Sequence, residues 1–253
     1  MPGSVQSVER AAAILRLLAR GPGSIGLGDV ATALGLSKST THGLLRTLRG
    51  VGFVEQDDVG RYRLGAEIGH LAARPLDVNE LRARAINWAD GLAARSGEVV
   101  RIGSLREGNV LVVHHVFRPD DTQQTLDVGT MLPSHATALG KVLLAYDKLA
   151  AARVTGRLLT SFTRRTVTGP AALRTVLSEV RSRGWASESG EWLPGEASIA
   201  APIRAPGGLV VGAVGVSGSA ERVCERPAEP DATLLAFVRD AARAVSRDLG
   251  TAR

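Results

Sequence analysis

Apolar residues recur at helical spacing in three short segments of the first 50 residues. Ser7 can cap a helix over residues 7–20, and residues 27–34 carry a second, shorter apolar face. Ser37 can cap a third helix, whose inner stripe consists of Thr41, Leu44, Leu45 and Leu48. Ser39, His42, Gly43 and Arg46 then form its outer face. Two alternating stretches, 53–56 and 61–64, flank a turn containing Gly60 and predict a β-hairpin.

Three helices followed by a hairpin predict a winged helix-turn-helix, a fold whose second paired helix enters the major groove of DNA. The outer face of the third helix carries small polar residues, a histidine and an arginine, and no acid that would repel phosphate. Alternation along a strand places Arg61 and Arg63 on one face of the hairpin. The alternative is a surface helix pair with a solvated basic face. The expected DNA-binding residues are Ser37, Lys38, Ser39, Thr40, His42, Arg46, Arg49, Arg61 and Arg63.

The pattern changes after residue 65, where a helical linker over residues 66–79 is broken at Pro75. Helices are expected over residues 81–92, 134–146, 173–180 and 231–249, the second of them capped by Ser134. Extended stretches are expected at 98–105, 109–116, 124–128, 198–203 and 209–218. Because the strands cluster in hairpins with helices around them, the pattern favours an α+β domain with an antiparallel sheet. The predicted domains are therefore 1–65 and 80–253, joined by the linker 66–79.

Composition narrows the class of protein. The 253 residues are 44% hydrophobic and 22% charged, which is typical of a globular chain and too apolar for disorder. The longest apolar run, residues 209–216, is eight residues long, far below the ~20 that a spanning helix needs. Together with charged residues near the N-terminus, this predicts a cytoplasmic protein. A single cysteine, Cys224, excludes an internal disulfide framework and a cysteine zinc site.

The net charge of +6 is unevenly distributed along the chain. Residues 1–65 carry eight basic and five acidic residues, so half of the excess lies on about a quarter of the length. Within them, residues 37–50 contain Lys38, Arg46 and Arg49 and no acid. This placement favours a polyanionic partner for the first domain.

Several quoted segments resemble the IclR family of bacterial transcriptional regulators. SVERAAAILRLLARGP (7–22), LGDVATALGLSKSTTHGLLRTLRGVGFVEQ (27–56) and GRYRLG (60–65) resemble its DNA-binding domain. LPSHATALGKVLLA (132–145), the pair Gly184–Trp185, and SIAAPI followed by VGAVGVSG (211–218) resemble its effector-binding domain. Within the family, VHHVFRPDD, LRARA and ARAVSRDLG resemble regulators of glycerol operons.

The resemblance implies a homodimer, or a tetramer, that binds a pseudo-palindromic double-stranded DNA operator and carries a GAF-like α/β effector-binding domain. It implies repression of a glycerol catabolic operon, relieved by glycerol or glycerol 3-phosphate, and no cofactor. An activator, or a regulator responding to an aromatic or oxo acid, is the alternative. One departure from the family pattern is Gly43, which stands where an arginine is common and leaves a DNA contact at that position open.

Seven residues are carried over as the expected effector site, six of them from the family pattern: Ala138, Leu139, Glu188, Ser198, Gly215 and Ser217. His135 joins them because it lies in the first turn of the expected 134–146 helix, where free N–H groups favour an anionic or polyhydroxylated ligand. His135 could instead pack locally, and both serines could be ordinary strand residues. Ser198 replaces a frequent cysteine and Gly215 a frequent serine, so an oxo acid fits this pattern less well.

Catalytic and metal-binding patterns are not found in the sequence. No nucleophile–base pair is coherent, so an enzyme that uses the helix-turn-helix only to dimerise is the weaker hypothesis. His114 and His115 are adjacent on an expected strand and face opposite ways, which argues against a metal site.

Overall fold

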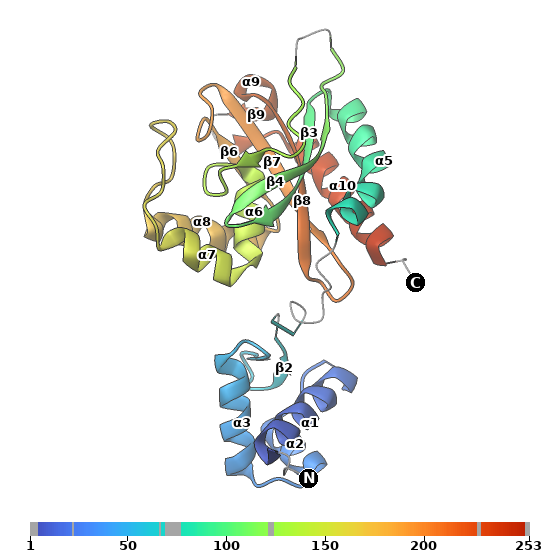
Figure 1. The fold of residues 1–253 in the computed structure, drawn as a ribbon, viewed down its shortest axis with the longest axis vertical. Coiled ribbons are helices and arrows are strands. Elements are labelled where there is room, and N and C mark those ends of the chain that lie inside the picture. The colour runs from blue at the N-terminus through green and yellow to red at the C-terminus, as the bar shows by residue number, and fades with distance from the viewer. Residues whose placement is uncertain are drawn as a thin grey trace. The chain divides into compact units, whose positions relative to one another are not determined.

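The computed structural model describes residues 5–21, 23–65, 67–68, 77–120, 124–226 and 229–250. The chain divides into two compact units, Met1–Arg74 and Pro75–Arg253 (Figure 1). The predicted linker 66–79 lies largely outside the described residues, and the predicted domain limits 1–65 and 80–253 remain predictions. None of the described helices is long and apolar enough to cross a membrane.

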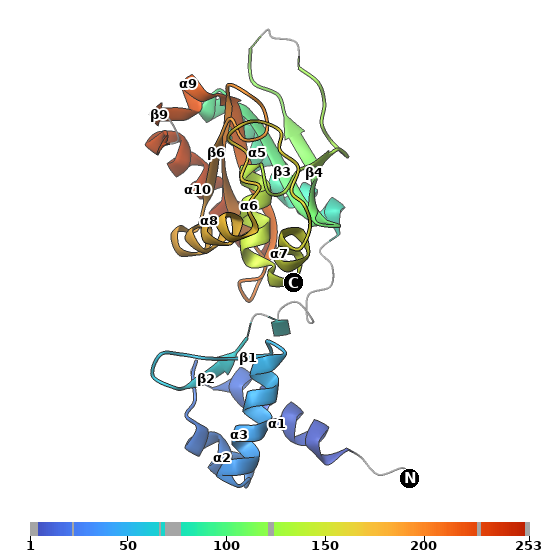
Figure 2. The same cartoon turned by 90° about the vertical axis from the view of Figure 1, so that its left-hand side faces the viewer.

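Over residues 5–65, apart from the undescribed residue 22, the first unit contains the helices α1 (Gln6–Arg20), α2 (Leu27–Leu34) and α3 (Lys38–Gly50). An antiparallel hairpin of β1 (Val54–Gln56) and β2 (Tyr62–Leu64) follows them (Figure 2). Gly35 ends α2 in the left-handed conformation, and Ser37 caps α3 as predicted. The core of this unit consists of Ile14, Leu18, Val30, Leu45, Leu48, Val54 and Tyr62. The sequence prediction of a winged helix-turn-helix is confirmed.

The second unit is built on a six-stranded antiparallel sheet in the order β5-β4-β3-β8-β7-β6. The strands are β3 (Val99–Arg106), β4 (Asn109–Val116), β5 (Met131–Leu132), β6 (Ala186–Ser189), β7 (Glu196–Arg204) and β8 (Val210–Ser219). A short pair, β9 (Cys224–Arg226) and β10 (Glu229–Pro230), follows the small helix α9 (Ala220–Val223). The predicted extended stretch 124–128 is wrong, because these residues form no strand and the edge strand is β5 instead.

Helices pack on both faces of the sheet (Figures 1 and 2). One face is packed by α5 (Val78–Ser96) and α10 (Ala232–Gly250), and the other by α6 (Ala138–Tyr146), with α7 (Lys148–Thr155) and α8 (Pro170–Arg183) packed against α6. Alternation along β8 produces the two layers, since Val214 and Val216 join the α5–α10 core whereas Ala213 joins the α6–α8 core. The α+β class is confirmed, and the sheet places the end of β6, the start of β7 and the end of β8 beside the start of α6.

Candidate functional site

Helix α3 divides into a buried and an exposed face, as its spacing predicts. Thr41 and Leu45 are fully buried and Leu48 is nearly so. Lys38, Ser39, His42 and Arg46 are exposed on the other side. These four residues supply two cations and a histidine and no carboxylate, so they present hydrogen-bond donors and small polar groups to a partner.

The first turn of α3 is organised by its cap. The Ser37 hydroxyl accepts a hydrogen bond from the Thr40 backbone N–H at 3.1 Å and contacts the Thr40 hydroxyl at 2.8 Å and the Ser39 hydroxyl at 3.0 Å. Ser37, Ser39 and Thr40 therefore form one hydroxyl cluster at the helix start, and Lys38 and Ser39 are exposed there. The structure keeps these four predicted residues together on one end of the helix.

The four predicted arginines differ in their surroundings. Arg46 has no ion pair or hydrogen bond among the described residues. Arg49 donates to the Gln56 side chain at 2.5 Å, which joins α3 to the hairpin. Arg61 donates to the Ser24 carbonyl at 2.9 Å, and Arg63 pairs with Glu55 at 3.2 Å. Because the Arg63 pair is exposed, water and salt screen it and the guanidinium can exchange partners readily.

The expected effector residues converge on one small cavity in the second unit. Ala138, Leu139, Glu188, Ser198, Gly215 and Ser217 all line it, together with Arg101, Leu132 and Trp192 among others. They come from α6 and from β6, β7 and β8, which are distant in sequence and adjacent in the fold. The cavity volume is about 30 Å³, close to the share of liquid volume that one water molecule occupies.

Helix α6 begins later than the sequence predicts. Its first residue is Ala138 and its cap is Thr137, whose hydroxyl accepts from the Gly140 N–H at 3.3 Å. Ser134, the predicted cap, instead donates to the Gly108 carbonyl at 2.5 Å. The prediction of a helix from residue 134 is therefore wrong. The shift puts the free N–H groups at Ala138 and Leu139, and the Ala138 N–H reaches the Ser198 hydroxyl at 3.4 Å.

The seventh expected residue, His135, does not join this cavity. Its Nε2 lies 2.9 Å from the Thr160 carbonyl, and its ring lies near the ring of Phe162. It borders a separate hollow of about 710 Å³ between α7 and the β3–β4 turn. Because the helix starts at Ala138, residue 135 precedes the turn whose N–H groups motivated its choice.

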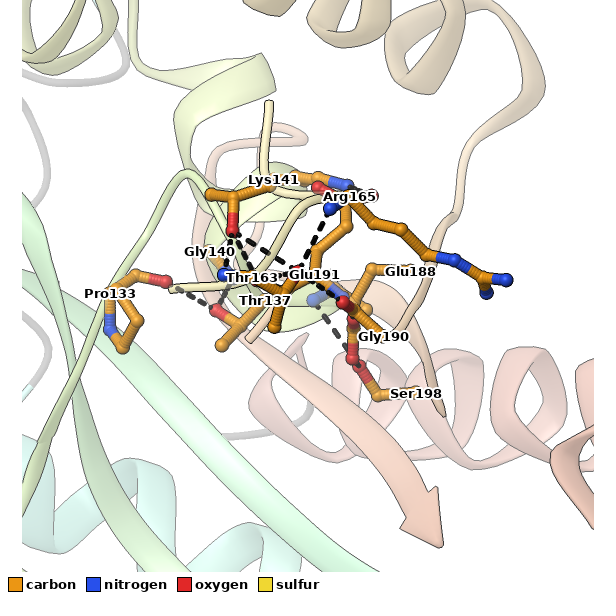
Figure 3. Close-up of polar contacts among 12 residues, drawn as sticks. Pro133, Thr137, Gly140, Lys141, Thr163, Arg165, Glu188, Gly190, Glu191 and Ser198 are labelled. Carbon is orange, nitrogen blue, oxygen red and sulfur yellow. Dashed lines mark hydrogen bonds and ion pairs between the residues drawn. The ribbon is translucent and has the colours of Figure 1, made fainter. Parts of the chain in front are cut away.

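Glu188 is the acidic wall of the cavity (Figure 3). Its Oε1 accepts from the Ser198 hydroxyl at 2.8 Å and its Oε2 accepts from the Glu191 N–H at 3.0 Å. Burial raises the pKa of the Glu188 carboxyl above its ordinary value, while these hydrogen bonds and the charge of Lys141 oppose the rise. The carboxylate is thus held in one orientation and shielded from bulk water.

Arg101 is a site residue that sequence reasoning missed. It lies on β3, its guanidinium pairs with Asp127 at 2.5 Å, and it also donates to the Ser217 hydroxyl. The Asp127 N–H in turn donates to His115 Nδ1 at 3.0 Å. Strand pairing aligns Arg101 with Gly215 across β3 and β8, and that pairing is the only signal that could have pointed to it. Arginine offers five N–H groups, so it keeps donors to spare for a ligand.

Gly215 explains one departure from the family pattern. A Cβ at this position would lie 2.5 Å from the Ile199 carbonyl oxygen and 3.0 Å from the Ala200 Cβ. Strands β7 and β8 therefore approach too closely here for a serine unless the backbone moves. The hydroxyls of the cavity come from Ser198 and Ser217 instead.

The described residues contain no group of three or more His, Cys, Asp or Glu side chains that could hold a metal ion. His114 on β4 lies opposite Ile102 on β3. Burial is the main cause that lowers the pKa of His114, and the charge of Arg82 is the second. The pKa of His115 is also lowered by burial, followed by the charge of Arg101. The neighbours of the two rings differ, as expected for adjacent residues on a strand.

Comparison with known proteins assigns both units. Residues 7–58 match the IclR helix-turn-helix domain, and residues 73–247 match the domain described as bacterial transcriptional regulator IclR C-terminal. The chain is 54% identical to the glycerol operon regulatory protein of Streptomyces coelicolor and 52% identical to that of Streptomyces griseus, each over 254 residues and 100% of both chains. A solved IclR transcriptional regulator from Alicyclobacillus acidocaldarius is 28% identical with a TM-score of 0.59, covering 98% of this chain and 100% of that one. The chain belongs to the IclR family of bacterial transcriptional regulators.

Proposed function

We propose that this chain represses a glycerol catabolic operon by binding a pseudo-palindromic operator as a homodimer, and that glycerol or glycerol 3-phosphate relieves the repression. The observation that carries the proposal is the full-length similarity to two glycerol operon regulatory proteins. The residues on the exposed face of α3 and around the cavity of the second unit are consistent with this function.

The exposed face of α3 supplies the DNA-binding part of the proposal. Lys38 and Arg46 contact phosphates or base edges in the major groove, and Ser39 and His42 lie between them on the same face. Arg61 and Arg63 extend the contact through the hairpin. A homodimer with two-fold symmetry places two such helices on two half-sites, which is why a pseudo-palindrome is the expected operator.

The cavity lining supports a polyol as the effector. Glu188 accepts hydrogen bonds, Arg101 and the N–H groups of Ala138 and Leu139 donate them, and the serine hydroxyls can do either. A polyol hydroxyl both donates and accepts, so it satisfies both kinds of wall. Glycerol 3-phosphate would direct its phosphate to Arg101 and its hydroxyls to Glu188.

Effector binding must change the cavity. A space of about 30 Å³ holds roughly one water molecule, so a ligand of several heavy atoms requires the walls to separate. An effector that binds the widened state more tightly than the narrow one shifts the population toward it. If the widened state binds the operator less well, linkage requires that effector binding lowers the affinity for the operator and that operator binding lowers the affinity for the effector.

Calorimetry with glycerol, glycerol 3-phosphate and an aromatic acid tests the effector directly, and anisotropy with operator DNA tests the sign of control. Binding of one of the first two, with release of DNA, is expected. Binding of the aromatic acid alone would contradict the hypothesis that glycerol or glycerol 3-phosphate is the effector. Tighter DNA binding in the presence of effector would make the protein an activator. Turnover of either glycerol compound by the purified chain would favour an enzyme.

A further inference from the structure

A buried lysine lies behind the acidic wall of the effector cavity. Lys141, on α6, is only 2% exposed, and its Nζ lies 2.5 Å from Oε1 of Glu191. A buried ammonium is costly unless a charge or several hydrogen bonds compensate it. Among the described residues Oε2 of Glu191 is buried and has no hydrogen-bond partner, so Lys141 is the main compensation for that carboxylate.

The turn that carries Glu191 is also held through its backbone (Figure 3). The Thr163 hydroxyl donates to the Gly190 carbonyl at 2.5 Å, and the Thr166 hydroxyl donates to the Glu191 carbonyl at 2.6 Å. The Gly190 N–H donates to the Glu196 carbonyl at 2.7 Å. The ion pair to Lys141 fixes the same turn from the side of α6.

This turn also fixes the position of the Glu188 carboxylate, which lines the cavity. The Glu191 N–H donates to Glu188 Oε2, so a displacement of the turn moves or frees Glu188. Trp192, the next residue, lines the cavity as well. Resting on the proposed effector function, we propose that the Lys141–Glu191 ion pair is the positioning device for Glu188, and that Lys141 thereby sets effector affinity without contacting the effector.

The charge of Lys141 gives a second, separable effect. Groups that face Glu188 include Lys141 on α6, Glu191 in the turn, Cys224 on β9, and Arg101 and Glu196 in the cavity wall. Among the two charges that act on Glu188, Lys141 lowers its pKa more than Glu191 raises it. Removing both charges therefore raises the pKa of Glu188, and neutralising a lysine that does not act on Glu188 leaves that pKa unchanged.

The test uses the full-length chain with the double variant Lys141→Met/Glu191→Gln, which leaves no unpaired charge buried. Lys148→Met is the matched control, because it removes an exposed lysine from α7. Urea unfolding establishes that each variant is folded. The Glu188 carboxyl is then titrated by ¹³C NMR, with its signal assigned through Glu188→Gln, and calorimetry with glycerol and glycerol 3-phosphate is run from pH 5 to pH 8.

In the double variant we expect the Glu188 titration midpoint to move to higher pH. Affinity for the bound probe should fall roughly tenfold at neutral pH, the loss expected for a misplaced charged hydrogen-bond partner. Operator affinity without effector should stay at the wild-type value. A folded double variant with the wild-type midpoint and wild-type affinity overturns the proposal. If the wild type binds neither probe, the glycerol hypothesis fails. Hydrogen exchange of the Glu191 amide then decides the positioning role, because faster exchange in the double variant supports it and unchanged exchange overturns it.

Discussion

Gly43 on the exposed face of α3 allows stability and DNA contact to be separated. A Cβ added there meets no atom within 4 Å, so alanine fits the free protein without strain. Glycine inside a helix costs about 0.5–1 kcal/mol relative to alanine. Gly43→Ala should therefore stabilise α3 by that amount. Gly35→Ala is the matched opposite, because its φ of 62° costs an L-residue about 1–2 kcal/mol.

Hydrogen exchange of the α3 amides in the full chain measures this effect, since a two-unit chain need not unfold in one step. Exchange should slow roughly two- to fivefold in Gly43→Ala and quicken in Gly35→Ala, following about 1.4 kcal/mol per tenfold. Faster α3 exchange in Gly43→Ala would refute the reasoning. Anisotropy with operator DNA then shows the purpose of the glycine: weaker binding by this more stable variant indicates close approach to DNA, and unchanged binding indicates a tolerated glycine.

Three further predictions concern the two sites and pH. Arg46→Ala should weaken operator binding at least tenfold and flatten its salt dependence in anisotropy titrations, whereas an unchanged affinity would remove α3 from the interface. Ser217→Ala should alter the effector response in calorimetry and spare operator binding without effector; loss of DNA binding in a folded variant would contradict that division. The lowered pKa values of His114 and His115 mean that the unfolded chain takes up protons first, so unfolding free energy should fall as pH drops below the ordinary histidine value of 6.5. Urea unfolding of His114→Leu should show a smaller decline, and an identical decline would assign the pH dependence elsewhere.

The helices and strands whose limits depend on residues close in sequence were predictable from the sequence. Ser37 caps α3 because its hydroxyl reaches an N–H three residues on, which is a local rule. The strand at 109–116 matches β4 residue for residue. The start of α6 was not predictable, because the Ser134 hydroxyl donates its hydrogen bond to the carbonyl of Gly108, 26 residues away in the β3–β4 turn, and does not cap the helix.

The candidate effector cavity also combines features that the sequence predicted with features that it did not. Six expected residues meet there because the family pattern already encodes the convergence of α6 with β6, β7 and β8. His135 was chosen from a helix start that tertiary packing moved, and it lies elsewhere. Arg101 and the Lys141–Glu191 pair were not predicted. A single arginine or lysine forms no sequence motif, and only strand pairing and burial place it beside a partner.

We propose that this protein binds the control region of a glycerol operon and releases it when its effector binds. The most direct measurement incubates the purified full-length chain with fragmented genomic DNA of its own organism, with and without glycerol or glycerol 3-phosphate, and sequences the bound fragments. We expect enrichment of a pseudo-palindromic site beside glycerol uptake and kinase genes, and we expect that enrichment to be lost when one of the two compounds is present. Enrichment only at unrelated genes, or binding that neither compound changes, would contradict it.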